Sequence, residues 1–468
     1  MSANKCIRAA VLLLCAAMLF SVPSACGPGS EKIKISVGFR YGASEQERQY
    51  YSECKAEFER RYPQYELVSS PYVYDSRTIV SKYASGQLPV LFEADAAEAL
   101  RALANGYVRD VSGYMDGFGW TEKADGFFLS EITSAYGVCG VPAQQYAAGM
   151  VLNLPLLARA GVIEEEAGGY VLYDDDGVPL WPDTFDEVEA AAAKVAETCG
   201  EGVSGVLLPS GDGECGGLYL DMAYNFGCGA LERQQDGVYR LDLGSEGFGD
   251  AMRWVRRLAQ ERYTDDSKSY GAEEWAAEMA AGRAAVTFCN SDDLAAALAA
   301  EPSLRGSLAF VPMPSSGESC SAWRGTVYAV SALAGDAQAE GAFRFLQFIG
   351  CGPDSDDAAL SATERRLQAY ISQGMPLLPC LPVWEDEDYL AGISGLYERY
   401  SDGGALYCDA FYRGFAQRRR HGEPFARREL CELMDELFSR MIFDATTSNI
   451  VTLLEESETA FTEKYLNR

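Results

Sequence analysis

The chain contains a single histidine, His421, among its 468 residues. Histidine is the side chain most often used for general acid–base catalysis and for zinc ligation, so its scarcity argues against most hydrolase mechanisms. The sequence also lacks a Gly-x-Ser-x-Gly motif and any Cys-x-x-Cys pair, which are signatures of serine hydrolases, zinc ribbons and thioredoxin-like sites. We therefore predict no catalytic residue, no metal site and no cofactor.

Basic side chains are scarce as well. The chain has 39 Lys and Arg against 69 Asp and Glu, and its formal net charge is −30. Such a surface repels phosphate backbones and anionic lipids, so nucleic acid is excluded as a partner and so is polybasic docking on a membrane. A neutral or cationic ligand fits this charge better.

The one long apolar run lies at the N-terminus. Residues 1–8 carry two positive charges, residues 9–22 are almost purely apolar, and small residues precede Cys26. This layout predicts a secretory signal over residues 1–25, because the apolar run is shorter than the roughly 20 residues of a membrane-spanning helix. The junction is similar to that of bacterial lipoproteins, with Pro23 replacing the usual leucine, which predicts lipidation of Cys26 and a tether over residues 26–31. Ordinary secretion with cleavage near Ala25, or an uncleaved anchor, is the alternative.

Beyond Cys26 the cysteines number eleven, so they cannot all pair with one another. We expect most of them to be small buried hydrophobic residues, although export leaves some disulfides possible.

The body of the chain alternates between strand and helix signals. Apolar residues at every second position predict a strand over 33–39, helical spacing predicts a helix ending before Pro63, and a second strand follows at 64–70. Strand, helix and strand in about 35 residues form a crossover unit of a parallel sheet. The alternation continues with glycine stops after helices at Gly86 and Gly106. We expect a polar kink over 142–146 between two short strands, and mostly helices after residue 333.

Two weaker signals have simpler structural explanations. GDGECG, residues 211–216, matches Gly-x-Gly-x-x-Gly, but Asp212 and Glu214 would face a pyrophosphate with no base nearby, so a tight turn before a helix is the better interpretation. Thr184 and Glu187 form a capping box that predicts a helix start. A secreted carbohydrate-active enzyme needs only two carboxylates and stays open as a rival, although no particular pair stands out.

A series of segments carries a family resemblance. It comprises FERRYPQYELV, KYASGQLPVLFEAD, LRALANGYVRDVSGYM, YGVCGVPAQQYAAGMVLNLPLLARAGV, PDTFDEVEAAAAKVAE, MAAGRAAVTFCNSDDL, FVPMPSSG, GTVYAVSAL and AEGAFRFLQFI. In their order and spacing from Lys32 onward, the chain resembles the extracellular solute-binding lipoproteins of bacterial ABC importers (family 1, sugar-binding, maltose-binding-protein-like). Val90 and the pair Leu152-Asn153 depart from the family's usual Asp and Tyr-Asn.

The resemblance implies an α/β, two-lobed periplasmic-binding-protein-like fold (type II) with hinge strands and additional C-terminal helices. Lobe 1 is expected over 32–142 and 313–350, and lobe 2 over 143–312 and 351–468. It further implies a monomer, not an enzyme, that captures a small solute, expected to be a mono- or oligosaccharide, between the lobes. The partners would be ABC permease subunits and, through the lipid anchor, the outer face of the cell membrane, within the periplasm if the host has an outer membrane.

Candidate ligand contacts follow from strand ends and from the resemblance. Ligands of open α/β sheets bind at the carboxyl ends of strands, where aromatic rings, amides and carboxylates can meet a sugar. Relatives send a side chain into the cleft from the position of Tyr146. The predicted contacts are Tyr41, Asp95, Gln144, Tyr146, Asn290, Trp323 and Arg324. The rivals within this fold are a receptor that feeds a sensor kinase and one that binds a peptide or polyamine.

Overall fold

The structure is a computed structural model. It describes residues 31–38, 45–72, 75, 77–166, 168–211, 213, 215–229, 231–233, 239–271, 274–402, 404–415, 418–422, 426–444 and 449–466. The predicted signal peptide, Cys26 and Tyr41 lie outside these residues. No helix in the described part of the chain is long and apolar enough to cross a membrane.

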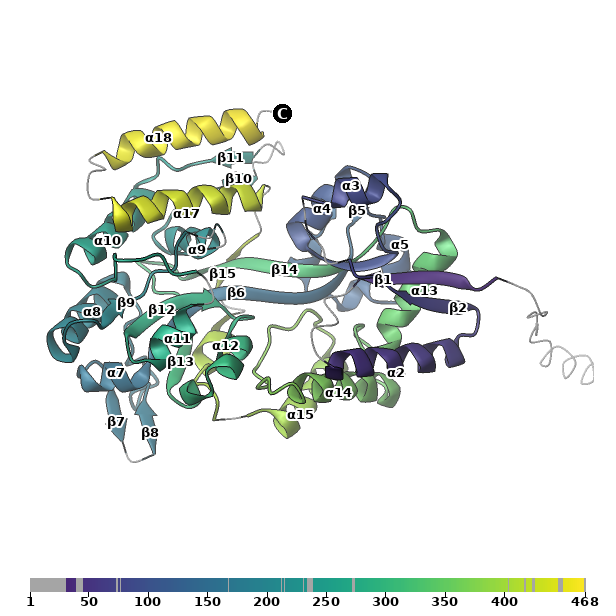
Figure 1. Ribbon diagram of the computed structural model, residues 1–468, viewed down its shortest axis with the longest axis horizontal. Helices are drawn as coiled ribbons and strands as arrows, with labels where there is room; N and C mark the ends of the chain where they lie inside the picture. The colour runs from purple at the N-terminus through teal and green to yellow at the C-terminus, as the bar shows by residue number, and fades with distance from the viewer. Residues whose placement is uncertain are drawn as a thin grey trace, which may run out of the picture.

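One mixed sheet runs through the whole molecule in the order β2-β1-β3-β14-β6-β12-β9, and β13 and β15 pair with β6 and β14 (Figure 1). Its strands are β1 (Ile33–Gly38), β2 (Tyr65–Ser69), β3 (Leu91–Asp95), β6 (Val141–Asn153), β9 (Ser204–Val206), β12 (Ala284–Asn290), β13 (Leu308–Pro312), β14 (Cys320–Val330) and β15 (Arg419–His421). We call the half built on β1 to β3 lobe 1, and the half built on β9, β12 and β13 lobe 2. The long strands β6 and β14 belong to both.

Lobe 1 packs its helices around a core that includes Phe58, Trp120 and Phe343. Its helices are α2 (Glu45–Arg61), α3 (Ile79–Ala84), α4 (Ala96–Ala104), α5 (Ser112–Gly117), η1 (Thr121–Lys123), α6 (Gly126–Glu131), α13 (Asp336–Phe348) and α14 (Asp357–Ile371), with the short strands β4 (Thr133–Ser134) and β5 (Gly137–Val138). Parallel pairing of β1 with β2 and β3 confirms the predicted crossover unit.

Lobe 2 has a larger core with Phe248, Trp254 and Phe438 at its centre. Its helices are α7 (Leu154–Arg159), α8 (Phe185–Cys199), α9 (Gly216–Asn225), α10 (Glu246–Gln260), α11 (Trp275–Ala280), α12 (Leu294–Ala300), η2 (Pro302–Leu304), α16 (Asp409–Gly414), α17 (Arg427–Phe443), α18 (Ile450–Phe461) and η4 (Thr462–Leu466). Two hairpins, β7 (Glu164–Glu166) with β8 (Gly169–Val171) and β10 (Leu231–Arg233) with β11 (Tyr239–Leu241), extend it, and α15 (Glu387–Tyr400) follows α14 below the sheet (Figure 1).

Local sequence signals place these elements well. The capping box is present, since Glu187 N–H donates to Thr184 Oγ1 and the Glu187 carboxylate accepts from Thr184 N–H at the start of α8. The predicted glycine stops Gly86 and Gly106 have φ of 69° and 72°, which a side chain rarely tolerates. None of the eleven described cysteines forms a disulfide, and nine of them are buried.

The predicted kink over residues 142–146 is wrong. β6 is one strand of 13 residues, and its first half pairs with β14 while its second half pairs with β12 and β13. The irregularity lies instead in the pairing, as a register shift between Thr326 and Val327 opposite Gln144 and Pro142. A bulge of this kind absorbs an extra residue and bends the ladder without ending the strand.

The lobe boundaries differ from the predicted ones at two places. Helix α14 packs on α2, and Trp384 belongs to the lobe 1 core, although residues after 350 were expected in lobe 2. Conversely, Cys320 and Ala322 at the start of β14 pack in the core of lobe 2. The C-terminal region therefore covers both lobes, because apolar faces on both remain to be buried after the sheet is complete.

Candidate functional site

Four of the predicted contacts lie on the two hinge strands. In the antiparallel pair of β6 and β14, Gln144 is opposite Thr326, Tyr146 is opposite Arg324, and Ala147 is opposite Trp323. These pairs occupy the stretch where the sheet passes from lobe 1 to lobe 2. We call this stretch, together with the ends of β3, β12, α9 and α17 that meet it, the lobe junction.

Arg324 and its partner Asp221 are deeply buried charges at the lobe junction. Arg324 Nη2 donates to Asp221 Oδ2 at 2.8 Å and to the Gly217 carbonyl at 2.6 Å, and its Nη1 donates to Asn290 Oδ1 at 2.6 Å. Burial raises the pKa of Asp221, although the adjacent Arg324 opposes that shift. Burial also opposes the charge on Arg324, yet the Asp221 carboxylate raises the pKa of this guanidinium. Through these hydrogen bonds the pair fixes α9, β12 and β14 to one another.

The space around this ion pair is tight. A Cβ on Gly217 would lie 2.9 Å from Arg324 Nη2, so only glycine lets the guanidinium reach the first turn of α9. Asp221 Oδ1 also accepts from the Ala322 backbone N–H at 2.6 Å. Arg324 was predicted as a ligand contact, but most of its hydrogen-bonding capacity serves the protein.

Asn290 connects this network to the loop after β12. Its Oδ1 accepts from Arg324, while its Nδ2 donates to Asp293 Oδ2 at 3.4 Å. In the same loop, desolvation and the neighbouring charge of Asp293 raise the pKa of Asp292 to about 7. The strand-end argument thus placed Asn290 beside a carboxyl group that ionises near neutral pH.

Tyr146 lies beside the same loop. The Ser291 N–H donates to the Ala147 carbonyl at 3.0 Å, so the residue after Tyr146 is bonded to the loop that carries Asp292. Tyr146 is 8 % exposed, and its hydroxyl is close enough to Arg324 to influence the pKa of the guanidinium. Gln144 is exposed to solvent, two residues earlier on β6.

Trp323 is placed differently from a sugar-stacking residue. It is 1 % exposed, and its ring packs edge-on against Phe128 with centroids 4.7 Å apart. Its Nε1 donates to Gln145 Oε1 at 2.8 Å, and Gln145 Nε2 in turn donates to the Pro382 carbonyl. In this structure Trp323 therefore holds the hinge strands to lobe 1 and presents no open ring face.

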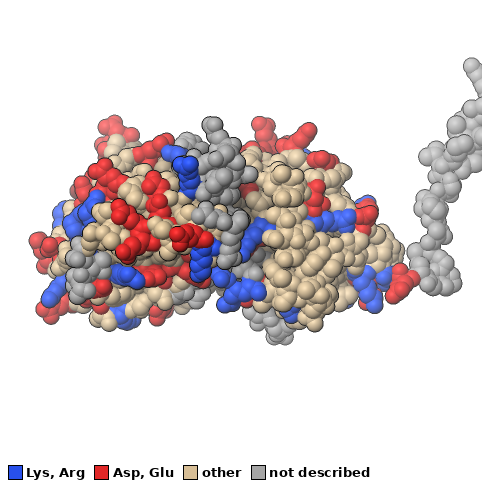
Figure 2. All heavy atoms as spheres, turned by 90° about the horizontal axis from the view of Figure 1, so that it is seen from above, with Lys and Arg blue, Asp and Glu red and all other residues tan. Residues whose placement is uncertain are grey.

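Asp95 faces lobe 2 from the end of β3. Its Oδ1 is 4.0 Å from Arg427 Nη1 at the start of α17, and one helix turn further on Arg101 of α4 is 3.7 Å from Glu429. Figure 2 shows the molecule from above, with basic side chains along the border between its two halves and many acidic side chains on the lobe 2 half. Opposite charges from the two lobes therefore meet at the lobe junction.

A third interlobe ion pair comes from β15. Arg420 Nη1 lies 3.1 Å from both carboxylate oxygens of Asp125, and its guanidinium lies 4.4 Å above the centroid of the Phe127 ring. Asp125 is only 6 % exposed. Sequence reasoning missed Arg420 and Arg427, although both occur in RRRHGEPFARR, an unusually basic stretch for so acidic a chain.

In the glycine-rich loop at 211–216, backbone N–H groups that could bind a phosphate are already hydrogen-bonded within the protein. The Asp435 carboxylate of α17 accepts from the Gly211 N–H at 2.8 Å and from the Gly213 N–H at 2.8 Å. A phosphate would have to displace this carboxylate, which agrees with the interpretation of the motif as a turn before α9. Among the described residues, no group of His, Cys, Asp and Glu has the arrangement of a metal site.

A two-lobed α/β protein joined by hinge strands, with polar side chains from both lobes at the junction, has the architecture of a solute receptor. Residues 53–366 match the family described as bacterial extracellular solute-binding protein. The chain belongs to this family, which confirms the resemblance and the fold class. No curated protein matches the chain.

Solved structures agree with this fold. A solute-binding protein of an ABC transporter from Thermotoga lettingae, bound with alpha-D-tagatose, is 15 % identical with a TM-score of 0.66, covering 93 % of this chain and 99 % of its own. The cyclic alpha-maltosyl-1,6-maltose binding protein from Arthrobacter globiformis is 16 % identical with a TM-score of 0.65, covering 92 % and 99 %. UgpB from Mycobacterium tuberculosis, in complex with glycerophosphocholine, is 15 % identical with a TM-score of 0.65, covering 93 % and 99 %.

Proposed function

We propose that this protein captures a small carbohydrate at the lobe junction and delivers it to an ABC permease without changing it chemically. The observation that carries the proposal is that Tyr146, Asn290 and Asp95 lie on neighbouring strands of the sheet where it passes between the lobes of a solute-binding fold. A phenol ring, an amide and a carboxylate suit the C–H faces and hydroxyl groups of a sugar. Sugar-bound relatives of the same fold support this ligand class.

Binding at the junction would couple to movement of the lobes. A ligand that touches both lobes binds the closed form more tightly and so shifts the population toward it. The closed form is the one a permease would need to distinguish from the empty receptor. The bulge between Thr326 and Val327 lies where the hinge strands would bend.

Calorimetry with a panel of mono- and oligosaccharides tests the proposal. Tyr146→Ala should weaken binding of the best saccharide at least tenfold, or about 1.4 kcal/mol, with the fold intact. Tyr136→Ala is a matched control, since Tyr136 is 64 % exposed on the turn between β4 and β5. An unchanged affinity in Tyr146→Ala would remove the lobe junction as the binding site.

A cationic solute, such as a polyamine or a basic peptide, is a second candidate. Asp95, Asp292 and Asp293 give the junction several carboxyl groups, and Trp323 presents no ring for stacking. Because the pKa of Asp292 is about 7, affinity for a cation should rise as pH increases from about 6 to about 8. A neutral sugar should show little dependence over this range, so calorimetry at both pH values separates the two ligand classes.

We also propose that Cys26 carries a lipid that holds the receptor on the outer face of the cell membrane. The support is the short apolar segment followed by small residues before Cys26. Mass spectrometry of the mature N-terminus should detect a diacylglyceryl cysteine, and Cys26→Ser should release the protein into the soluble extracellular fraction. A membrane-retained Cys26→Ser protein would instead indicate an uncleaved anchor.

A further inference from the structure

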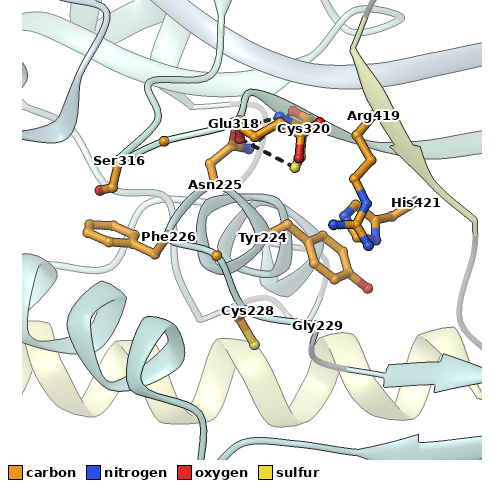
Figure 3. Close-up of a pocket in the computed structure, with 12 residues that line it drawn as sticks. Tyr224, Asn225, Phe226, Cys228, Gly229, Ser316, Glu318, Cys320, Arg419 and His421 are labelled. Atoms are coloured by element: carbon orange, nitrogen blue, oxygen red, sulfur yellow. Dashed lines mark hydrogen bonds between the residues drawn. The ribbon is translucent and has the colours of Figure 1, made fainter.

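A cavity of about 210 Å³ lies in lobe 2 beside the carboxyl end of α9 (Figure 3). Its wall is formed by residues 224–229 at the end of α9, by 316–318 and Cys320 before and at the start of β14, and by Arg419 and His421 of β15. None of these residues was predicted as a ligand contact. The cavity shares no lining residue with the contacts proposed at the lobe junction.

Successive side chains of β15 point to opposite sides of the strand and make different contacts. Arg419 and His421 line the cavity, whereas Arg420 between them pairs with Asp125 of lobe 1. Side chains of a strand point alternately to opposite sides, so the two faces of β15 are chemically separate. The strand is held beside β14 by the pairing of Cys320 with Arg419 and of Ala322 with His421.

The wall of the cavity is fixed by bonds within the protein. Asn225 Oδ1 accepts from the Cys320 N–H at 2.9 Å, and Asn225 Nδ2 donates to the Cys320 carbonyl at 3.2 Å, as the dashed lines in Figure 3 show. The His421 ring stacks on Tyr224 with centroids 4.1 Å apart and an interplanar angle of 3°. Burial, with a smaller effect from Arg419, lowers the pKa of His421 to about 4, so the imidazole is neutral at pH 7.

Three polar side chains on this wall form no hydrogen bond or ion pair with the described part of the protein; Arg419 and Glu318 are exposed to solvent, and His421 is half-buried. The imidazole nitrogens of His421 make no hydrogen bond there, and neither the Arg419 guanidinium nor the Glu318 carboxylate forms an ion pair within 4.0 Å. Arg420, on the other face of the same strand, is paired. A cation, an anion and a neutral donor-acceptor group thus line one cavity without pairing with one another.

We propose that this cavity is an accessory binding site for a small zwitterionic α-amino acid. Arg419 binds the carboxylate, since a guanidinium presents paired donors that match its two oxygens. Glu318 binds the ammonium group, which the partial negative charge at the carboxyl end of α9 also attracts. The neutral His421 imidazole donates to or accepts from a short polar side chain.

The size of the cavity limits the ligand. A volume of about 210 Å³ is the share of roughly seven water molecules in the liquid, so it suits an amino acid about the size of serine or threonine. The site does not depend on which solute binds at the lobe junction.

The single histidine makes a direct test possible. In tag-free protein labelled with 13C only in histidine, the one imidazole signal reports on the wall of the cavity. L-Serine should shift this signal saturably. Ethanolamine and 3-hydroxypropionate, which are serine without its carboxylate and serine without its ammonium group, should each bind at least about tenfold more weakly. Equal binding of the three, or no saturable shift below about 10 mM serine, would overturn the proposal.

Variants assign the two charged contacts. Arg419→Gln should abolish the serine-induced shift, and Glu318→Gln should remove the preference for serine over 3-hydroxypropionate. Arg420→Gln is the matched control on the opposite face of β15 and should leave serine binding unchanged. Tyr146→Ala should also leave it unchanged. A shift that survives Arg419→Gln but is lost in Tyr146→Ala would place serine at the lobe junction and overturn the accessory site.

Discussion

The two sides of the lobe junction are built differently. On the lobe 2 side, Arg324 is hydrogen-bonded to Asp221 and Asn290, and the side chains of Arg324 and Asp221 are 4 % and 1 % exposed. Across to lobe 1, Asp95 and Arg427 are 34 % and 22 % exposed and lie 4.0 Å apart. The first arrangement holds elements of one lobe and the hinge together, whereas the second joins surfaces that a receptor has to separate.

This difference has an energetic meaning. A buried ion pair contributes little compared with an apolar replacement, but it makes the loss of either partner costly. A half-exposed pair contributes roughly 0 to 1 kcal/mol and is screened by salt. The molecule therefore uses strong coupling where geometry has to stay fixed and weak coupling where the lobes have to part.

The largest effect is expected from Asp221→Ala. The change leaves the Arg324 guanidinium buried without its counter-charge and should lower the free energy of unfolding by about 3 to 5 kcal/mol, measured by urea denaturation. The double variant with Asp221→Leu and Arg324→Met should recover much of this loss, because it removes both charges. A cost below about 1 kcal/mol for Asp221→Ala would show that the Arg324 guanidinium is solvated in the folded protein.

The interlobe pair of Arg420 and Asp125 should behave in an intermediate way. Asp125 is buried and also caps α6 by accepting from the Phe128 N–H at 2.6 Å. Arg420→Gln should lower the free energy of unfolding by about 1 to 3 kcal/mol, since Asp125 loses its cation and lies beside Glu385. Arg420→Lys keeps the charge and should recover part of the loss in the same urea titration. No difference between the two variants would assign the effect to packing on Phe127.

The sequence predicted local elements of the fold well, but it did not predict the contacts between distant segments. Period-2 and helical spacing located β1, α2, β2 and β3, because these signals are local. Spacing could not show that β6 continues through residues 142–146, since its polar residues satisfy partners far away in the chain, as Gln145 does with Trp323 and Pro382. Asn290 was found from its position at a strand end, whereas the role of Arg427 depends on α17 lying opposite the end of β3, which no local pattern records.

A change of pH should affect the face of β15 that carries His421 and not the face that carries Arg420. The pKa of His421 falls from 6.5 to about 4 on folding, so below pH 6.5 the unfolded chain binds a proton that the folded protein does not. The free energy of unfolding is therefore unaffected by this histidine above pH 6.5 and decreases as pH falls toward 4. The decrease is at most about 1 kcal/mol per pH unit, because the ring is partly solvated.

His421→Gln removes this contribution. Between pH 7 and pH 4.5 its urea midpoint should fall less than that of the wild type, because only the wild type loses stability through the imidazole, and NMR of the single imidazole should give the pKa directly. A measured pKa near 6.5 would mean that Tyr224 does not shield the ring. Arg420→Gln serves as the control, because it should not alter the pKa of His421 by more than about half a unit.

The smallest effect should come from Arg427→Gln, which weakens the contact between α17 and Asp95. We expect the unfolding free energy to change by less than about 1 kcal/mol, but a loss of about 0.5 kcal/mol specific to the closed form would raise the open-to-closed ratio roughly twofold. Single-molecule FRET between one dye in each lobe measures this ratio in the ligand-free protein. The dyes are best attached through unnatural amino acids, because the chain holds fourteen cysteines.

Arg428→Gln is the matched control, since its partner Glu432 lies on the same helix at 3.3 Å. The two variants should converge at about 0.5 M salt, where the charges are screened. A population shift as large in Arg428→Gln as in Arg427→Gln would show that the net charge of α17, rather than its contact with lobe 1, controls closure.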